Sequence, residues 1–145
     1  MQDHIDFHMQ LESTPWRIDV DVKDRKATRR GDVQRHDPIL LEYTNVLGRP
    51  GWVRGKAHII AQRVTSGDDF VLLDRVKLQS HLETVFTRDE LDNPDRDGRK
   101  GALRRVLGRR DRRDAFAWFS LEEACKEAAC GVLVSKETAK RMLSL

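Results

Sequence analysis

Three acidic residues and one lysine form the group best suited to chemistry: Asp6, Asp21, Lys23 and Glu42. Asp21 and Lys23 are two positions apart, so in a β-strand both side chains leave the same face. Hydrolysis of a phosphodiester needs carboxylate oxygens that hold Mg²⁺, and a cation that orients the attacking water and offsets the charge of the transition state. These residue types therefore predict Asp6 and Asp21 as metal ligands, Lys23 as the cation, and Glu42 as a further ligand or a base.

Each of these residues also has a structural interpretation. Alternating charges on an exposed sheet face usually interact with solvent or form surface ion pairs, which is the alternative for Asp21 and Lys23. Glu42 lies in the apolar segment 39–43. A carboxylate in a central strand must find a partner or a metal, and a pair with an arginine is the structural alternative for Glu42.

Strands must position this group, and the alternation of polar and apolar residues predicts where they lie. In segment 17–23 an isoleucine and two valines share one face, so the charged residues share the other. The mostly apolar segment 38–44 is typical of a central strand, and a turn at 66–69 joins the two strands that flank it as a hairpin. The predicted strands are residues 5–9, 17–23, 38–44, 57–64, 70–74 and 115–119.

Helical spacing of apolar residues follows these strands. Residues 92–101 are polar and contain glycine and proline, which predicts a loop. Ser120 and Glu123 form a capping box that begins a helix. The predicted helices are residues 76–86, 102–107, 121–129 and 136–143. Strands and helices together indicate an α/β (α+β) domain around a mainly mixed sheet.

Basic residues are gathered in two parts of the chain, although the net charge is only +3. Segment 96–114 has nine basic residues against three acidic ones, and segment 23–35 has six against two. Such clusters suit a polyanion, because each neutralised phosphate releases counterions. A solvated charged surface is the alternative. The residues expected to bind nucleic acid are Arg25, Lys26, Arg29, Arg30, Arg104, Arg105, Arg109, Arg110, Arg112 and Arg113.

The order of several motifs along the chain is informative. An Asp in a first strand is followed by Asp21-Val22-Lys23-Asp24-Arg25-Lys26 in the next, by Glu42 in the third, and then by Gly51-Trp52 and Ala57-His58-Ile59-Ile60-Ala61. Over residues 5–85 this order resembles the PD-(D/E)XK nuclease superfamily, in particular small viral and bacterial members that are restriction-endonuclease-like or Holliday-junction-resolvase-like.

The resemblance implies a fold and an activity. The fold is a restriction-endonuclease-like mixed central β-sheet flanked by helices, with residues 1–145 as a single nuclease domain and an arginine-rich segment at 96–114. Asp6 matches the first acid of the superfamily, Asp21 the second metal ligand and Lys23 the catalytic lysine. The implied cofactor is Mg²⁺ or Mn²⁺, and the implied reaction is cleavage of DNA.

We therefore expect a metal-dependent DNA endonuclease that acts on duplex, branched or single-stranded DNA. No segment is typical of a base-reading helix, so we expect recognition of DNA structure with little sequence specificity. Cutting both strands of a duplex with one site per chain favours a homodimer. The alternative is a non-catalytic nucleic-acid-binding or host-interaction protein on the same fold.

Other classes of protein fit the sequence poorly. No apolar run approaches the roughly 20 residues of a membrane helix, and the first residues lack the pattern of a signal peptide. The expected location is therefore the cytoplasm, or the host cytoplasm if the chain is viral. Cys125 and Cys130 are too few for a disulfide scaffold and lack partners for zinc. The motifs of serine hydrolases and of phosphate-binding glycine-rich loops are also missing.

Overall fold

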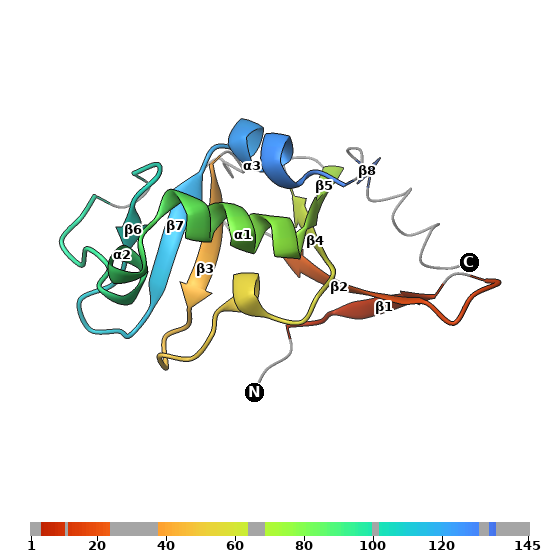
Figure 1. Cartoon of the computed structure of the whole chain (residues 1–145), viewed down its shortest axis with the longest axis horizontal. Coiled ribbons are helices and arrows are strands. Elements are labelled where there is room, and N and C mark those ends of the chain that lie inside the picture. Colours follow the sequence, from red (N-terminus) through yellow and green to blue (C-terminus); the bar gives the residue numbers. More distant parts are fainter. Residues whose placement is uncertain are drawn as a thin grey trace, which may run out of the picture.

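Two β-sheets and three α-helices make up the part of the chain that the computed structural model describes, which is residues 4–10, 12–23, 38–63, 69–99, 102–130 and 134–135 (Figure 1). Sheet A has the strand order β1-β2-β4-β5-β8, and sheet B has the order β3-β7-β6. The strands of sheet A are β1 (Phe7–Gln10), β2 (Arg17–Lys23), β4 (Ile59–Arg63), β5 (Asp69–Asp74) and β8 (Val134–Ser135). Those of sheet B are β3 (Ile39–Thr44), β6 (Val106–Leu107) and β7 (Ala115–Phe119). The fold is thus α+β.

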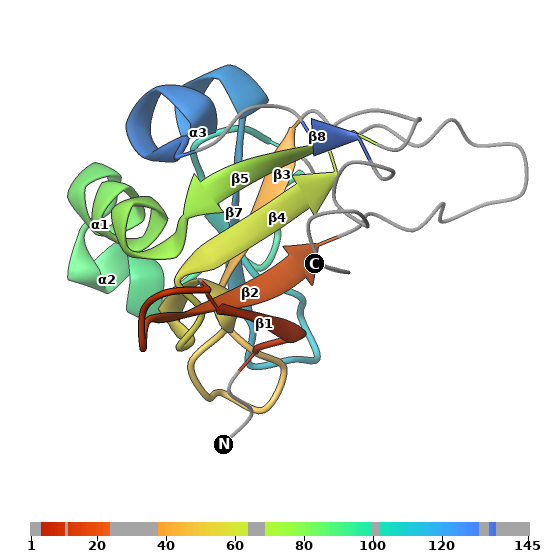
Figure 2. The same cartoon turned by 90° about the vertical axis from the view of Figure 1, so that its right-hand side faces the viewer.

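The helices lie mainly beside sheet A. They are α1 (Arg75–Val85), α2 (Arg88–Asp92) and α3 (Leu121–Ala128), with a 3₁₀ turn η1 at Trp52–Arg54. Figure 2 shows α1 and α3 on one side of β4 and β5, and both helices contact β5 and each other. No helix of the described residues is long and apolar enough to cross a membrane.

Sheet A is mixed. Strand β2 pairs with β1 in antiparallel fashion and with β4 in parallel fashion, while β4 and β5 form the antiparallel hairpin that the turn at 66–69 predicts. The β1–β2 ribbon extends away from the helices and from sheet B (Figure 1). Strand β2 therefore lies between an edge strand and the interior of the sheet.

Both sheets contribute to one hydrophobic core. Ile60 and Leu73 of sheet A and Leu41 of sheet B are fully buried, and Leu78 and Leu82 of α1 pack against them. Buried residues alternate with more exposed ones along β3, whereas three consecutive residues are buried in β2, in β4 and in β7. The strand predictions for 17–23, 38–44, 70–74 and 115–119 agree with β2, β3, β5 and β7 to within one residue.

The arrangement of the strands corrects two predictions. The single mixed sheet is wrong, because β7 pairs with β3 and β6 and forms a separate sheet. Strand β3 is an edge strand of that sheet and not a central strand. Periodicity reports which face of a strand is buried, but not which strand it pairs with, so both errors concern long-range pairing.

Three helix predictions have different outcomes. The helix at 121–129 is confirmed as α3, and the Ser120 side chain accepts a hydrogen bond from the backbone N–H of Glu123. The basic helix at 102–107 is wrong, because Val106 and Leu107 are buried as β6 against β7. The segment 136–143 lies outside the described residues. Helix α2 was not predicted, although Thr87 begins it with a capping box.

Candidate functional site

The charged face of β2 points into the molecule. Asp21 is only 2% exposed, and Asp19 is also buried. In the ladder Asp21 pairs with Ile60, whose side chain lies in the core, and paired residues share a face. The solvated sheet face offered as an alternative for Asp21 is therefore wrong.

The Asp21 carboxylate has one paired and one unpaired oxygen. Its Oδ1 lies 3.0 Å from Lys23 Nζ. Its Oδ2 is buried and has no hydrogen-bond partner among the described residues. Burial raises the pKa of Asp21 to about 6, the neighbouring Asp6 carboxyl adds to the rise, and Lys23 opposes it. Asp21 is thus a carboxylate with one oxygen open for coordination, and its ionised form is destabilised by burial.

Asp6 lies beside this carboxylate through backbone pairing. Its N–H donates to the carbonyl of Val20 at 2.8 Å, directly before the start of β1. Its Oδ2 accepts from the backbone N–H of Val22 at 2.6 Å. The Asp6 carboxyl is held next to Asp21 closely enough to raise the pKa of Asp21. The two acids predicted as metal ligands are therefore neighbours.

Lys23 connects this pair to Glu42 and Trp52. Its Nζ lies 5.3 Å from the centroid of the Trp52 ring. Burial raises the pKa of Glu42, while the Lys23 ammonium and the backbone N–H of Trp52 oppose the rise. The charge of Arg109 also acts to lower the pKa of Glu42, and that of Asp114 acts to raise it. Arg109 forms its ion pair with Asp114, and among the described residues Glu42 forms no ion pair with an arginine.

Gly51 is what brings Trp52 against β3. A Cβ at this position would lie 2.3 Å from the carbonyl oxygen of Glu42, so a side chain does not fit. The backbone N–H of Gly51 donates to the carbonyl of Tyr43 at 2.8 Å. This close approach places the N–H of Trp52 at the Glu42 carboxylate and the indole ring beneath Lys23.

The donor set suits a hard divalent cation. Among the described residues no group of three or more His, Cys, Asp and Glu side chains converges as a metal site. Mg²⁺ commonly binds to proteins through only one or two carboxylates and keeps several waters. The unpaired Oδ2 of Asp21, with Asp6 beside it, fits this manner of binding.

Comparison of the chain with protein-family models, with curated proteins and with solved structures finds no match. The resemblance to the PD-(D/E)XK superfamily therefore depends on the residues of the chain itself.

Five arginines of segment 96–114 form ion pairs. The pairs of Arg105 and Arg110 are exposed and contribute little to stability, whereas Asp114, the shared partner of Arg96 and Arg109, is buried. Arg112 and Arg113 are exposed and form no ion pair within the described ranges. The pairs are Arg96 with Asp114 at 3.7 Å, Arg104 with Glu123 at 3.3 Å, Arg105 with Asp95 at 2.7 Å, Arg109 with Asp114 at 2.7 Å, and Arg110 with Asp97 at 2.7 Å. The other predicted basic residues, Arg25, Lys26, Arg29 and Arg30, lie outside the described residues.

Two buried acids were not singled out from the sequence as site residues. Asp114 is 2% exposed and accepts hydrogen bonds from the backbone N–H and the Nε of Arg109. Asp19 lies 2.5 Å from His8 Nδ1 and 3.0 Å from Arg17 Nε. Burial acts to raise the pKa of Asp19, but the hydrogen bond to His8 and the charge of Arg17 hold it below its usual value. Both acids are fully partnered, which distinguishes them from Asp21. Their position among basic residues was the only signal in the sequence.

Proposed function

We propose that this protein is a metal-dependent DNA endonuclease that hydrolyses phosphodiester bonds, with a restriction-endonuclease-like arrangement of its catalytic residues. The observation that carries the proposal is the buried Asp21 carboxylate, which keeps one oxygen without a partner beside Asp6 and Lys23. A buried carboxylate with an unpaired oxygen destabilises the fold. Such groups concentrate at functional sites, where binding of a ligand compensates for the cost.

The residues divide the work of hydrolysis. Asp21 and Asp6 would hold Mg²⁺ or Mn²⁺, which when bound supplies a Lewis acid for the scissile phosphate. The Lys23 ammonium, held 3.0 Å from Asp21, orients the attacking water and offsets the negative charge that develops on the phosphoryl group. Glu42, whose pKa is raised by burial, is suited to accept a proton from that water.

The arginine-rich segment supports DNA as the substrate. Exposed ion pairs contribute little to stability, so Arg105 and Arg110 exchange their carboxylate partners for phosphates at low cost. Arg112 and Arg113 are exposed for the same use. Phosphate contacts orient DNA without reading its sequence, so we propose recognition of DNA structure. Cleavage of both strands of a duplex would need a second copy of the chain.

The test is a cleavage assay with labelled single-stranded, duplex and branched DNA, in Mg²⁺, Mn²⁺ or EDTA. We expect products with either metal and none with EDTA. Asp21→Asn and Lys23→Ala should each lower the rate at least about 100-fold, because each removes a group that acts at the scissile phosphate. Asp92→Asn and Lys77→Ala make the same chemical changes at exposed positions of α2 and α1, and should cleave like the wild type.

Two results would contradict the proposal. Wild-type cleavage rates in both Asp21→Asn and Lys23→Ala would show that these residues are not catalytic. Salt-sensitive DNA binding without any metal-dependent product would favour the non-catalytic nucleic-acid-binding protein instead.

A further inference from the structure

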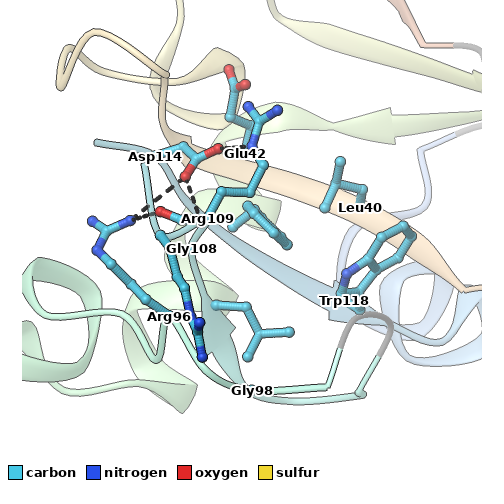
Figure 3. A pocket seen from close by; sticks show the side chains of 11 residues that line it. Leu40, Glu42, Arg96, Gly98, Gly108, Arg109, Asp114 and Trp118 are labelled. Carbon is cyan, nitrogen blue, oxygen red and sulfur yellow. Dashed lines mark hydrogen bonds and ion pairs between the residues drawn. The ribbon is translucent and has the colours of Figure 1, made fainter. Parts of the chain in front are cut away.

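A pocket of about 490 Å³ lies on the face of sheet B that points away from the core (Figure 3). Leu40 and Trp118 are paired across β3 and β7, and Phe116 is paired with Glu42. These residues alternate along their strands with the buried core residues, so all four belong to the outer face. The pocket therefore has an apolar, largely aromatic floor.

The walls of the pocket are charged. Asp114 binds Arg109 on one side, and Arg96 donates to the carbonyl of Arg109 at 2.8 Å and lies 3.7 Å from Asp114 (Figure 3). A Cβ at Gly108 would lie 2.5 Å from Arg96 Nη1, so glycine leaves the room that this guanidinium occupies. The network holds two guanidinium groups at the rim, above the aromatic floor. Arginine is the side chain best suited to bind phosphate.

This combination matches the parts of a nucleotide. A base has two apolar faces that stack on aromatic side chains, and a polar edge with N–H donors. Glu42 also lines the pocket, and its carboxylate is an acceptor for such donors. The phosphate of the same nucleotide would meet Arg96 or Arg109.

Glu42 links the pocket to the proposed catalytic group. Glu42 lines the pocket and also interacts with Lys23, which lies 3.0 Å from Asp21. A nucleotide held in the pocket would therefore belong to the strand that reaches Asp21.

We infer that the pocket binds the unpaired base of a nucleotide close to the scissile phosphate, so that the substrate is single-stranded or locally unpaired DNA. The inference deepens the proposed endonuclease function and rests on it for the scissile bond. A base inside an intact duplex is paired and stacked, and it enters a pocket only after it leaves the helix. Intact duplex is accordingly a poor substrate.

The test measures nucleotide binding apart from cleavage. It uses the full chain with Asp21→Asn, in EDTA, titrated with each of the four deoxynucleoside 5′-monophosphates and with 2-deoxyribose 5-phosphate. Leu40→Glu adds a negative charge to the floor at a partly exposed position. Phe116→Leu removes an aromatic ring and keeps most of the apolar volume. Val76→Glu makes the same change as Leu40→Glu on the exposed face of α1 and serves as the matched control.

We expect at least one nucleotide to bind at least about fivefold more tightly than the sugar phosphate, because base stacking contributes to its affinity. Leu40→Glu and Phe116→Leu should each lower the affinity for that nucleotide by a similar factor, while Val76→Glu should leave the affinity unchanged. Equal affinity for nucleotide and sugar phosphate, or unchanged affinity in both pocket variants, would overturn the inference.

A second measurement separates this inference from the proposed function. In the Asp21 wild-type background, Leu40→Glu should lower cleavage of single-stranded DNA at least about fivefold relative to Val76→Glu. Cleavage that is equal in the two variants would overturn the pocket assignment and leave the endonuclease intact. Nucleotide binding by a protein that cleaves no DNA would overturn the endonuclease and leave a nucleotide-binding pocket.

Discussion

At the scale of single residues, Asp21 and Asp19 show that two buried carboxylates on one strand can have opposite electrostatic environments. The two side chains leave the same face of β2, and both are buried. Asp19 is surrounded by His8 and Arg17, whereas Asp21 has Lys23 on one oxygen and no partner on the other. The two pKa values therefore shift in opposite directions: the pKa of Asp19 is lowered and that of Asp21 is raised.

The raised pKa of Asp21 predicts a pH dependence of stability. The pKa is about 6 in the folded protein, above the value of about 4 expected in the unfolded chain. The stability that protonated Asp21 contributes is therefore fully present below pH 4 and is lost as the pH rises through 6. The loss is on the order of 2–3 kcal/mol.

Asp21→Asn cannot ionise, so its free energy of unfolding should lack this loss and should exceed that of the wild type at pH 8. Urea unfolding at pH 4.5 and pH 8 checks this, with Asp92→Asn as the control at an exposed position. The same pH dependence in wild type and Asp21→Asn would contradict the assignment of the titrating group.

The spacing of Asp21 and Lys23 was sufficient to predict that they act on the same volume. It was not sufficient to predict that this volume is inside the molecule. A strand with alternating charges is expected to face solvent, whereas Asp21 is buried and pairs with the core residue Ile60, a long-range pairing that local periodicity does not report. The role of Asp21 as a ligand stays a prediction.

At the scale of elements, local patterns predicted most strands and failed where distant segments pair. Residues 115–119 alternate as β7 does, and Ser120 begins α3 as its capping box predicts. Residues 102–107 have helical composition, but their last two residues pair with β7 and become β6. Tertiary pairing overrides local propensity in that segment.

The turn between β3 and η1 supports a prediction at this scale. In Gly51→Ala the new Cβ meets the backbone of Glu42 at 2.3 Å, and neither backbone segment has a flexible end that can move aside. We expect a destabilisation of about 2–4 kcal/mol. Trp52 should also move away from Lys23, which would be seen as a change in indole fluorescence.

Gly48→Ala provides the comparison for this variant. Gly48 has φ of +80°, but its Cβ would meet only the Arg113 side chain, at 3.3 Å. Its expected cost is about 1 kcal/mol, from backbone strain. Urea unfolding of both variants measures their free energies of unfolding, and we expect the larger decrease for Gly51→Ala. Equal decreases would show that Gly51 is not a point of close contact.

At the scale of the whole molecule, the arginine-rich segment is the surface that we propose for DNA binding. Five of its arginines have carboxylate partners, so much of the positive charge counted from the sequence is balanced locally. Arg112 and Arg113 remain without an ion pair in the described part of the chain. These two should release counterions most directly when DNA binds.

We therefore predict that Arg112→Ala and Arg113→Ala weaken DNA binding and each reduce the slope of log affinity against log salt by about 1. Fluorescence anisotropy with labelled DNA at several salt concentrations measures this slope. Arg88→Ala, an exposed arginine of α2 outside the segment, is the control. Slopes that stay unchanged in both variants would place the DNA on another surface.

The attachment of β1 gives the amino-terminal strand a significance beyond the site itself. Among the described strands β1 pairs only with β2, at the edge of sheet A, and Asp6 directly before it bonds to Val20 and Val22. A cation bound by both Asp6 and Asp21 would connect this edge of sheet A to the buried part of β2. Binding of the ion would then stabilise the pairing of β1 with β2, and its release would weaken that pairing. Occupancy of the metal site and local order of the amino-terminal strand would therefore change together.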